Sequence, residues 1–479
     1  MLETTNLFLI INLLSGAGYS LISPLFPTLG KKDDLSEGIL GWMIGIFPIA
    51  GSIFTTLVPI LCKKFSRVNL LCFGTFFEAI ITILYGFLIF ISNKALLMII
   101  IFSLRIFHGC CSAILGTLIY SLTISLAEKE KTQSSLGKLE IAWAVGTSSG
   151  PVIASVFYKI GGYPLPFFVT GLILFISFYL SLRINDKNIQ KDNDDEEEDN
   201  NYNYFKYLLN PEIYSILIGF VVCMINVTFY FPCLIYHLTN NYSVSVSAAS
   251  LFFITPIIPY TIILQYLDGI SAKFGIYLTF TFGLIFSGIS SIFIYPVPPL
   301  PHSLIVIIFG FLIIGIGSVP VFIPGLVLLA KNIKKSDDSI DEMSANDIAS
   351  AINTLCVELG DFMGPILGGF LTDHFGFKYC CLIVSVIGII YSAIFILLFY
   401  RRIKNDLDMV CHGKNSVNNA KNKEGLIGEK NKNEYFKNIK DDILMNKFFM
   451  RANSFSYKKY RKSINNENRN SLYSTLTKY

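Results

Sequence analysis

Apolar residues in this chain gather into long blocks separated by short polar segments. About twelve blocks reach or approach the roughly 20 residues that an α-helix needs to cross a bilayer. Because backbone groups in lipid must be satisfied within the helix, the pattern predicts an all-α membrane protein with twelve transmembrane helices. The spans are expected at residues 5–29, 38–61, 69–92, 95–127, 139–160, 165–184, 212–236, 246–267, 275–296, 303–330, 348–371 and 377–400.

Composition supports this class of protein. Apolar residues make up 53% of the chain and charged residues 15%, and the mean hydropathy is +0.56. These values exceed what a soluble globular protein carries, although the length would suffice for several soluble domains. The apolar run of the first span follows only Met-Leu-Glu-Thr-Thr-Asn, with no basic segment before it and no clear cleavage site after it. We therefore expect that span to remain as a helix.

One pattern of small residues and proline occurs twice, about 214 residues apart, each time inside an apolar span. Small residues four positions apart let two helices approach closely in lipid, and the proline leaves a backbone carbonyl that neighbours must satisfy. The repeat indicates two copies of one membrane half, an arrangement typical of secondary transporters. Its members are Gly146, Gly150, Pro151 and Ala154 in the first copy, and Gly360, Gly364, Pro365 and Gly368 in the second.

The polar segments divide the chain further. We expect a first six-helix half over residues 1–184, an acidic linker over 185–208, a second six-helix half over 209–400, and a basic tail over 401–479. The composition of the tail is typical of disorder, and its stretch from Arg451 to Lys462 is an alternative candidate for contact with anionic lipid or a protein partner. Lysine and arginine are more frequent in alternate loops, which predicts that the linker and both ends of the chain are cytosolic.

The ionisable residues inside apolar spans are the candidates for chemistry, because a charge at the bilayer centre costs about 2.5–3.5 kcal/mol on insertion scales. Glu78 lies in the third span. The fourth span carries one pair three residues apart, and the eleventh carries another, so each pair shares a helix face. A further acid lies near the start of the fifth span. The predicted site residues for substrate or proton coupling are Glu78, Arg105, His108, Glu140, Glu358 and Asp361.

Paired carboxylates have a direct use in a carrier. Two acids close together in a low dielectric cannot both ionise cheaply, so Glu358 and Asp361 can hold either a proton or a cationic substrate. That competition would couple proton movement to substrate movement in the opposite direction. The alternative is that these acids only position the bundle through ion pairs. Arg105 keeps its proton, so it needs an acid such as Glu78 or Glu140, or backbone carbonyls, as a partner.

Enzyme signatures give no support to catalysis. Residues 146–150 fit the G-x-S-x-G form of a nucleophile elbow, but they lie inside a predicted membrane helix and not at a strand-to-helix turn. The sequence has no phosphate-binding loop, no His-Glu-x-x-His and no paired-cysteine metal motif. We therefore expect no enzyme activity, no cofactor, no metal and no nucleic-acid partner.

The motifs resemble those of the major facilitator superfamily of secondary transporters. Residues 105–109 are similar to its fourth-helix Arg-x-x-x-Gly motif, and residues 146–151 and 360–369 are similar to its antiporter motif. Residues 18–27, 137–140 and the segment ending at 376–377 more narrowly resemble the vesicular amine transporters of the solute carriers, the polyamine-transporting branch above all. The resemblance implies that Arg105 takes part in proton coupling and that the two glycine-proline helices act in gating.

Some positions depart from that resemblance. The loop after the second span has Pro59 and Lys63 where the superfamily has a glycine and an acid, so gating from this loop does not transfer. Acids that monoamine carriers place in three helices are replaced here at Ser15, near residues 317–319 and at Thr354. Monoamine specificity is therefore not expected, and Glu358 and Asp361 are acids that this chain supplies itself.

Together these observations predict a secondary active transporter that exchanges protons for a small organic cation such as a polyamine or amine. Two alternatives remain at this point. One is a carrier for an organic anion or neutral solute with Arg105 in the substrate site; the other is a transporter-fold sensor that binds without transport and signals through its tail. The sequence leaves open whether the membrane is the plasma membrane or that of a vesicle or vacuole.

Overall fold

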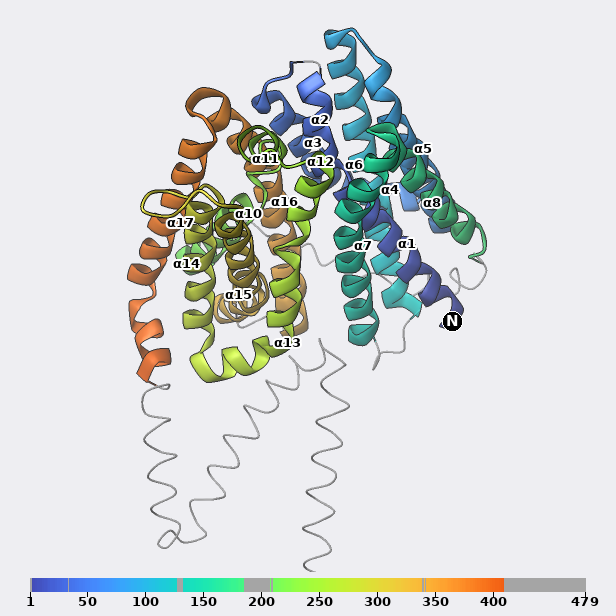
Figure 1. Ribbon diagram of the computed structural model, residues 1–479. Coiled ribbons are helices and arrows are strands. Elements are labelled where there is room, and N and C mark those ends of the chain that lie inside the picture. The colour runs from blue at the N-terminus through green and yellow to red at the C-terminus, as the bar shows by residue number, and fades with distance from the viewer. Residues whose placement is uncertain are drawn as a thin grey trace, which may run out of the picture.

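The computed structural model describes residues 2–32, 34–126, 132–184, 207, 210–337, 340 and 342–408. Every regular element in these ranges is a helix, and twelve of the helical segments are long and apolar enough to cross a membrane (Figure 1). The predicted class, an all-α protein with twelve transmembrane helices, is confirmed. The predictions for the acidic linker and for the tail beyond residue 408 fall outside the described residues.

The first half contains six membrane spans, several of them built from two helical pieces. Its elements are α1 (Leu2–Ser20), α2 (Ile22–Lys32), α3 (Glu37–Thr55), α4 (Val58–Cys62), α5 (Arg67–Phe87), η1 (Leu88–Phe90), α6 (Lys94–Leu126), α7 (Thr132–Gly161) and α8 (Pro164–Leu182).

The second half repeats this arrangement. Its elements are α10 (Pro211–Thr228), α11 (Leu234–Tyr242), α12 (Val246–Ser250), η4 (Leu251–Ile254), α13 (Ile257–Phe274), α14 (Ile276–Ile294), α15 (Leu304–Ser336), α16 (Glu342–Phe375) and α17 (Phe377–Leu398).

The first and seventh spans are interrupted at corresponding places, which the apolar pattern did not predict. The first span breaks at Leu21, three residues before Pro24, and the seventh breaks after Thr228, four residues before Pro232. A proline donates no amide hydrogen and crowds the carbonyl four residues earlier, so a break at this distance is its expected effect. The matching interruptions agree with a duplicated half.

The repeated glycines bring helices of the same half into backbone contact. A Cβ atom at Gly146 would lie 2.0 Å from the carbonyl oxygen of Leu13, so α7 lies directly on α1. In the second copy, a Cβ at Gly364 would lie 2.0 Å from Oγ1 of Thr228, so α16 lies directly on α10. The close approach predicted from the small residues is confirmed, and the two halves use it in the same way.

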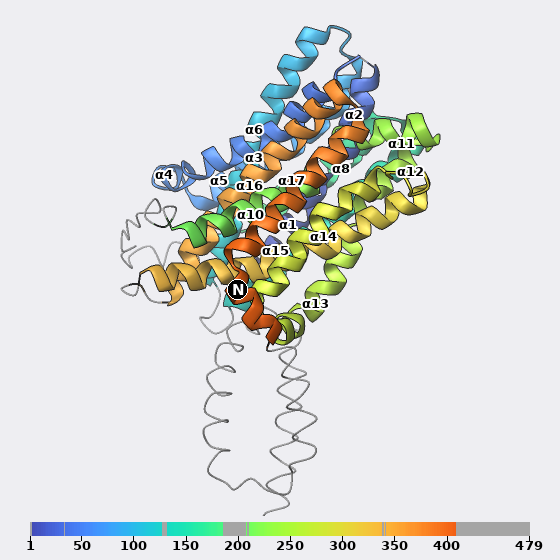
Figure 2. The ribbon, with the colours of Figure 1, turned by 90° about the vertical axis from the view of Figure 1, so that its left-hand side faces the viewer.

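The two halves meet at one face of the molecule. We call the face that carries the start of α1 and the last helical residues near 408 the terminal face, and the other the opposite face (Figures 1 and 2). Contacts between halves join α3 to α16, α2 to α11 and α12, and α7 to α12 and η4. In Figure 1 the ribbons of the two halves converge toward the opposite face. This conformation is closed at the opposite face.

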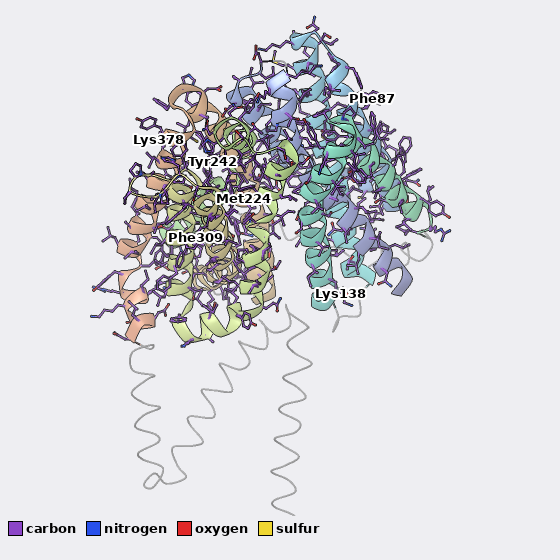
Figure 3. The ribbon with its side chains drawn as sticks, in the orientation of Figure 1. Phe87, Lys138, Met224, Tyr242, Phe309 and Lys378 are labelled. Carbon is purple, nitrogen blue, oxygen red and sulfur yellow. The ribbon has the colours of Figure 1, made fainter. Side chains whose placement is uncertain are left out.

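Large apolar side chains cover the sides of the bundle, as lipid contact requires. Phe87 and Phe309 are each about half exposed, and Figure 3 shows them on the outside of the helices. Lys138 lies at the terminal face in the same view, whereas Lys378 lies toward the opposite face. Apolar flanks between charged ends are the pattern expected of a protein that spans a bilayer.

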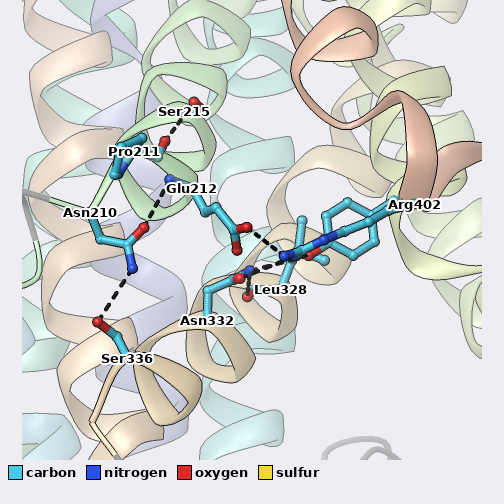
Figure 4. A network of polar contacts seen from close by, with 9 residues as sticks. Asn210, Pro211, Glu212, Ser215, Leu328, Asn332, Ser336 and Arg402 are labelled. Atoms are coloured by element: carbon cyan, nitrogen blue, oxygen red, sulfur yellow. Dashed lines mark hydrogen bonds and ion pairs between the residues drawn. The ribbon is translucent and has the colours of Figure 1, made fainter.

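Four segments of the second half are tied together at the terminal face (Figure 4). Arg402 pairs with Glu212 at 2.5 Å and also donates to the hydroxyl of Tyr277 and to Oδ1 of Asn332. Asn210 caps the start of α10 by accepting the amide of Glu212 at 3.0 Å. Charge-assisted bonds of this kind link α10, α14 and α15 to residues 400–408, so these segments are held together at the terminal face of the second half.

Candidate functional site

The first cluster of predicted site residues lies inside the first half. Glu78 of α5 and His108 of α6 are each 1% exposed, and His108 Nε2 lies 3.8 Å from Glu78 Oε1. Ser15 of α1 donates to the same carboxylate oxygen at 2.5 Å. On the other side of the imidazole ring, Nδ1 of His108 lies 3.3 Å from the hydroxyl of Tyr85. The structure therefore brings Glu78 and His108 together.

Two atoms in this cluster are buried without a hydrogen-bond partner among the described residues: Oε2 of Glu78 and Nε2 of His108. The pair sets a group that accepts a proton beside one that can donate it, in a place where burying either charge alone would be costly. This arrangement can store a proton away from water. The sequence placed both residues in the membrane but did not indicate that they form a pair.

Among the described residues, the hydrogen-bond acceptors of Arg105 are backbone carbonyls. Its Nε donates to the carbonyl of Met43 at 2.8 Å and its Nη2 to that of Ile44 at 2.6 Å. The carbonyl of Ile44 is free because Pro48, four residues later in α3, has no amide hydrogen. The guanidinium also lies 4.6 Å from the ring centre of Phe47.

The sequence offered Glu78 as one partner for Arg105. That prediction is wrong, since Glu78 pairs with His108. Glu140 lies in α7, but its side chain falls outside the described residues. The carbonyl alternative is confirmed. Arg105 is 2% exposed, and its Nη1 has no hydrogen-bond partner among the described residues.

The second cluster lies where the two halves meet. Asp361 of α16 is 7% exposed, and its Oδ2 accepts a hydrogen bond from the hydroxyl of Tyr19 in α1 at 2.7 Å. Glu358 lies one turn earlier on the same helix and is half-buried. Both acids and Arg105 lie close enough to Tyr19 to interact with it electrostatically. The bond from Tyr19 to Asp361 therefore joins the halves at the level of the predicted acids.

Aromatic rings connect the two clusters. The ring centre of Tyr19 lies 5.3 Å from that of Phe47 and 5.8 Å from that of Trp143 in α7. Phe47 in turn lies 4.9 Å from the imidazole of His108. Aromatic faces next to a carboxylate are the groups that bind alkylammonium ions, because ring and acid both attract the cation. Tyr19, Phe47 and Trp143 will be called the aromatic wall.

The sequence did not identify the aromatic wall or the roles of Ser15 and Tyr85. Aromatic residues make up 14% of this chain, so a single ring inside a span carries no signal of its own. The only advance indication was that Ser15 occupies the position of an acid in related carriers. Among the described residues, no group of three or more His, Cys, Asp or Glu side chains is placed to hold a metal ion.

Comparison with known proteins identifies the family. The sequence profile of the Major Facilitator Superfamily matches residues 8–339 and 216–410. The chain belongs to the Major Facilitator Superfamily. The resemblance seen in the sequence motifs is thereby confirmed, and the chain is a transporter of this superfamily and not an enzyme.

The chain is also similar to individual transporters. The chain is 25% identical to the human MFS-type transporter SLC18B1 over 413 residues, which covers 82% of this chain and 86% of that protein. It is also 27% identical to the multi-drug resistance efflux pump PmrA of Streptococcus pneumoniae serotype 4, over 36% of this chain and 42% of the pump. The similarity to SLC18 carriers agrees with the likeness to vesicular amine transporters.

Solved structures confirm the fold. The nucleoside transporter NupG superposes with a TM-score of 0.65 at 13% identity, covering 82% of this chain and 99% of that protein. A second structure is that of a bacterial homolog of the human lysosomal transporter Spinster, in an inward-facing and unoccupied conformation. It gives a TM-score of 0.65 at 13% identity and covers 84% of this chain and 97% of that protein. At these identities the comparison concerns the fold alone: two six-helix halves of the superfamily.

Proposed function

We propose that this chain is a proton-coupled antiporter for a small organic cation, such as a polyamine or another amine. The observation that carries the proposal is the contact between Asp361 and Tyr19, in which a nearly buried carboxylate of one half lies beside the aromatic wall of the other. A carboxylate next to aromatic faces suits an ammonium group better than an anion or a sugar.

Exchange follows from competition at the acids. When Asp361 or Glu358 carries a proton, the site is neutral there and releases a cation; when the proton leaves, the carboxylate attracts an ammonium group in its place. The Tyr19 hydroxyl stabilises the ionised form of Asp361 by donating to it. Each acid thus holds a proton or the substrate, and opening to alternate sides makes the two move in opposite directions.

The first cluster supplies a second place for a proton. Glu78 and His108 lie behind Phe47, away from solvent, and Arg105 fixes α3 through the carbonyls of Met43 and Ile44. A change of charge at the first cluster would alter the field at Phe47 and Tyr19 without touching the substrate. In this proposal Glu78, Arg105 and His108 couple proton binding to the movement of α3.

Relatives and topology support the remaining parts of the proposal. SLC18B1 is named as an MFS-type transporter and PmrA as a multi-drug resistance efflux pump, so a proposed role in transport fits both relatives. The excess of lysine and arginine in the loops on the side of the chain ends supports a cytosolic terminal face. The present conformation, closed at the opposite face, would then be the inward-facing one.

Purified protein in liposomes tests the proposal. The protein is reconstituted with its cytosolic face on the outside of the vesicles, which have an acidic interior and a neutral exterior. These vesicles should accumulate labelled spermidine, and a protonophore should abolish the accumulation. A panel of amines, amino acids and organic anions offered as competitors identifies the substrate class. If no amine produces a flux that depends on the pH gradient, organic-cation antiport is wrong.

A second candidate is an organic-anion carrier in which Arg105 binds the substrate. It is favoured by one observation: the buried Nη1 of Arg105 has no hydrogen-bond partner within the part of the chain that the structure describes. Nε and Nη2 of this guanidinium already bond to carbonyls of α3. Two acids of α16 lie near the same site, so an anion would meet more repulsion than attraction. Competition of uptake by carboxylates instead of amines would select this candidate.

A further inference from the structure

The carboxylate of Asp373, near the end of α16, lies on the first turn of α3 in the other half. Its Oδ1 accepts the amide of Glu37 and its Oδ2 accepts the amide of Gly38, both at 2.8 Å. The first amides of a helix have no partner within the helix, and a negative charge there is favoured by the helix dipole. Ser36 accepts the amide of Ile39. The free amides at the start of α3 are therefore bound by one side chain from each half, Ser36 and Asp373.

The backbones at this seam are in direct contact. A Cβ atom at Gly41 would lie 2.2 Å from the carbonyl of Pro365, and one at Gly369 would lie 2.1 Å from the carbonyl of Glu37. Gly38 has no room for a side chain either, because its Cβ would lie 2.7 Å from Asp373 Oδ2. No substrate can pass between α3 and α16 here, so this contact must break whenever the opposite face opens.

We propose that Asp373 is the latch of the opposite face: its two bonds to α3 form when that face closes and break when it opens. The carboxylate is exposed, so water can replace both amides as the bonds break, and no charge has to leave a buried site. The latch is therefore a reversible, charge-assisted contact between halves. It lies at the opposite-face end of α3 and α16, and α16 also carries Asp361.

The duplication shows that the latch exists at only one of two equivalent seams. Gly162 and Gly376 occupy corresponding positions in the two copies, and both have positive φ. Counting back three residues gives Lys159 in α7 and Asp373 in α16. A lysine has no acceptor for amides and is repelled by a helix start. The seam of α7 with α12 and η4 therefore cannot form the same carboxylate contact at this position, whereas the seam of α3 with α16 does.

This inference rests on alternating access in the proposed function, but it does not depend on the substrate. Hydrogen–deuterium exchange of the full-length protein in detergent or nanodiscs, without substrate or pH gradient, measures it directly. In Asp373→Ala, amides 37 and 38 should exchange roughly three- to tenfold faster, since two hydrogen bonds are lost. Segments 361–370 and 39–45 should also exchange faster, because the whole seam opens more often.

Ser303→Ala is the matched control, since Ser303 caps α15 with a bond to the amide of Val306 inside one half. It should raise exchange only at the start of α15. Asp373→Asn, which keeps one acceptor, should give an intermediate effect and replaces the alanine variant if that one does not purify.

Faster exchange confined to amides 37 and 38, with segments 39–45 and 361–370 unchanged in either variant, would reduce Asp373 to a local cap and overturn the latch. Loss of amine transport in the wild-type protein would contradict the proposed function and leave this result standing.

Discussion

Arg105 shows how one residue's role is set by a neighbour far along the chain. Its guanidinium needs acceptors inside the membrane, and α3 provides one because Pro48 leaves the carbonyl of Ile44 free. The sequence indicated that Arg105 needed either an acid or carbonyls. It could not decide between them, because the choice depends on how α6 is rotated against α3 and α5.

Replacing Arg105 with lysine should therefore lower transport by about tenfold or more, since an ammonium group cannot span two carbonyls and stack on Phe47 at once. The variant should still fold, because the positive charge and the stem of the side chain remain. Uptake per reconstituted molecule measures the effect, and Arg183→Lys, at an exposed arginine on the terminal side, serves as control. Equal uptake in Arg105→Lys and wild type would show that the two carbonyl bonds do not matter.

Neutralising the acids of α16 tests their assignment. The double variant Glu358→Gln with Asp361→Asn should abolish coupling, because neither position can then exchange a proton for a cation. Thr354→Val on the same helix should leave coupling intact, since the Thr354 hydroxyl bonds only to the carbonyl of Ser350. Unchanged antiport in the double variant would reassign both acids to a structural role.

Removing the hydroxyl of Tyr19 tests the partner of Asp361. Tyr19→Phe keeps the aromatic wall but loses a bond to a buried carboxylate, a change of roughly ten- to a hundredfold in the stability of that contact. We expect a shifted pH dependence of uptake with little change in protein yield. A pH profile identical to that of the wild type would show that Tyr19 does not affect protonation of Asp361.

At the scale of elements, the helices and their close contacts follow from local sequence, and their interruptions only in part. Long apolar blocks and glycines four residues apart predicted the spans and the contacts of α7 and α16 correctly. The breaks near Leu21 and after Thr228 were missed, because an apolar block with one proline continues equally well as a kinked helix. The residues that face each other between two packed helices could not be predicted either, since the sequence does not fix how each helix is rotated about its axis.

The glycine contacts predict a large difference between two similar substitutions. Gly146→Ala should destabilise the protein by about 1–3 kcal/mol, since the new methyl group would overlap the carbonyl of Leu13. Gly116→Ala should be neutral or slightly stabilising, because nothing lies within 4 Å of its Cβ position. Thermal unfolding of both variants in the same detergent measures this; equal melting temperatures would contradict the contact between α7 and α1.

For the whole molecule, a series of contacts leads from inside the first half across the seam to α16. His108 lies between Glu78 and Phe47, Phe47 lies against Tyr19, and Tyr19 donates to Asp361. Asp373, which carries the proposed latch, lies further along the same helix α16. Sequence identified the acids as unusual because charges in lipid are costly. It missed Asp373, since an acid at the end of a span has no such cost and carries no signal until the partner helix is placed.

The most direct test of this arrangement is proton movement driven by substrate alone. Vesicles that contain the protein and a trapped pH dye, with no initial pH gradient, should become more alkaline inside when spermidine is added outside, because each entering cation displaces protons outward. The double variant of Glu358 and Asp361 should show no such change. A wild-type protein that takes up the amine while the internal pH stays constant would contradict proton-coupled exchange.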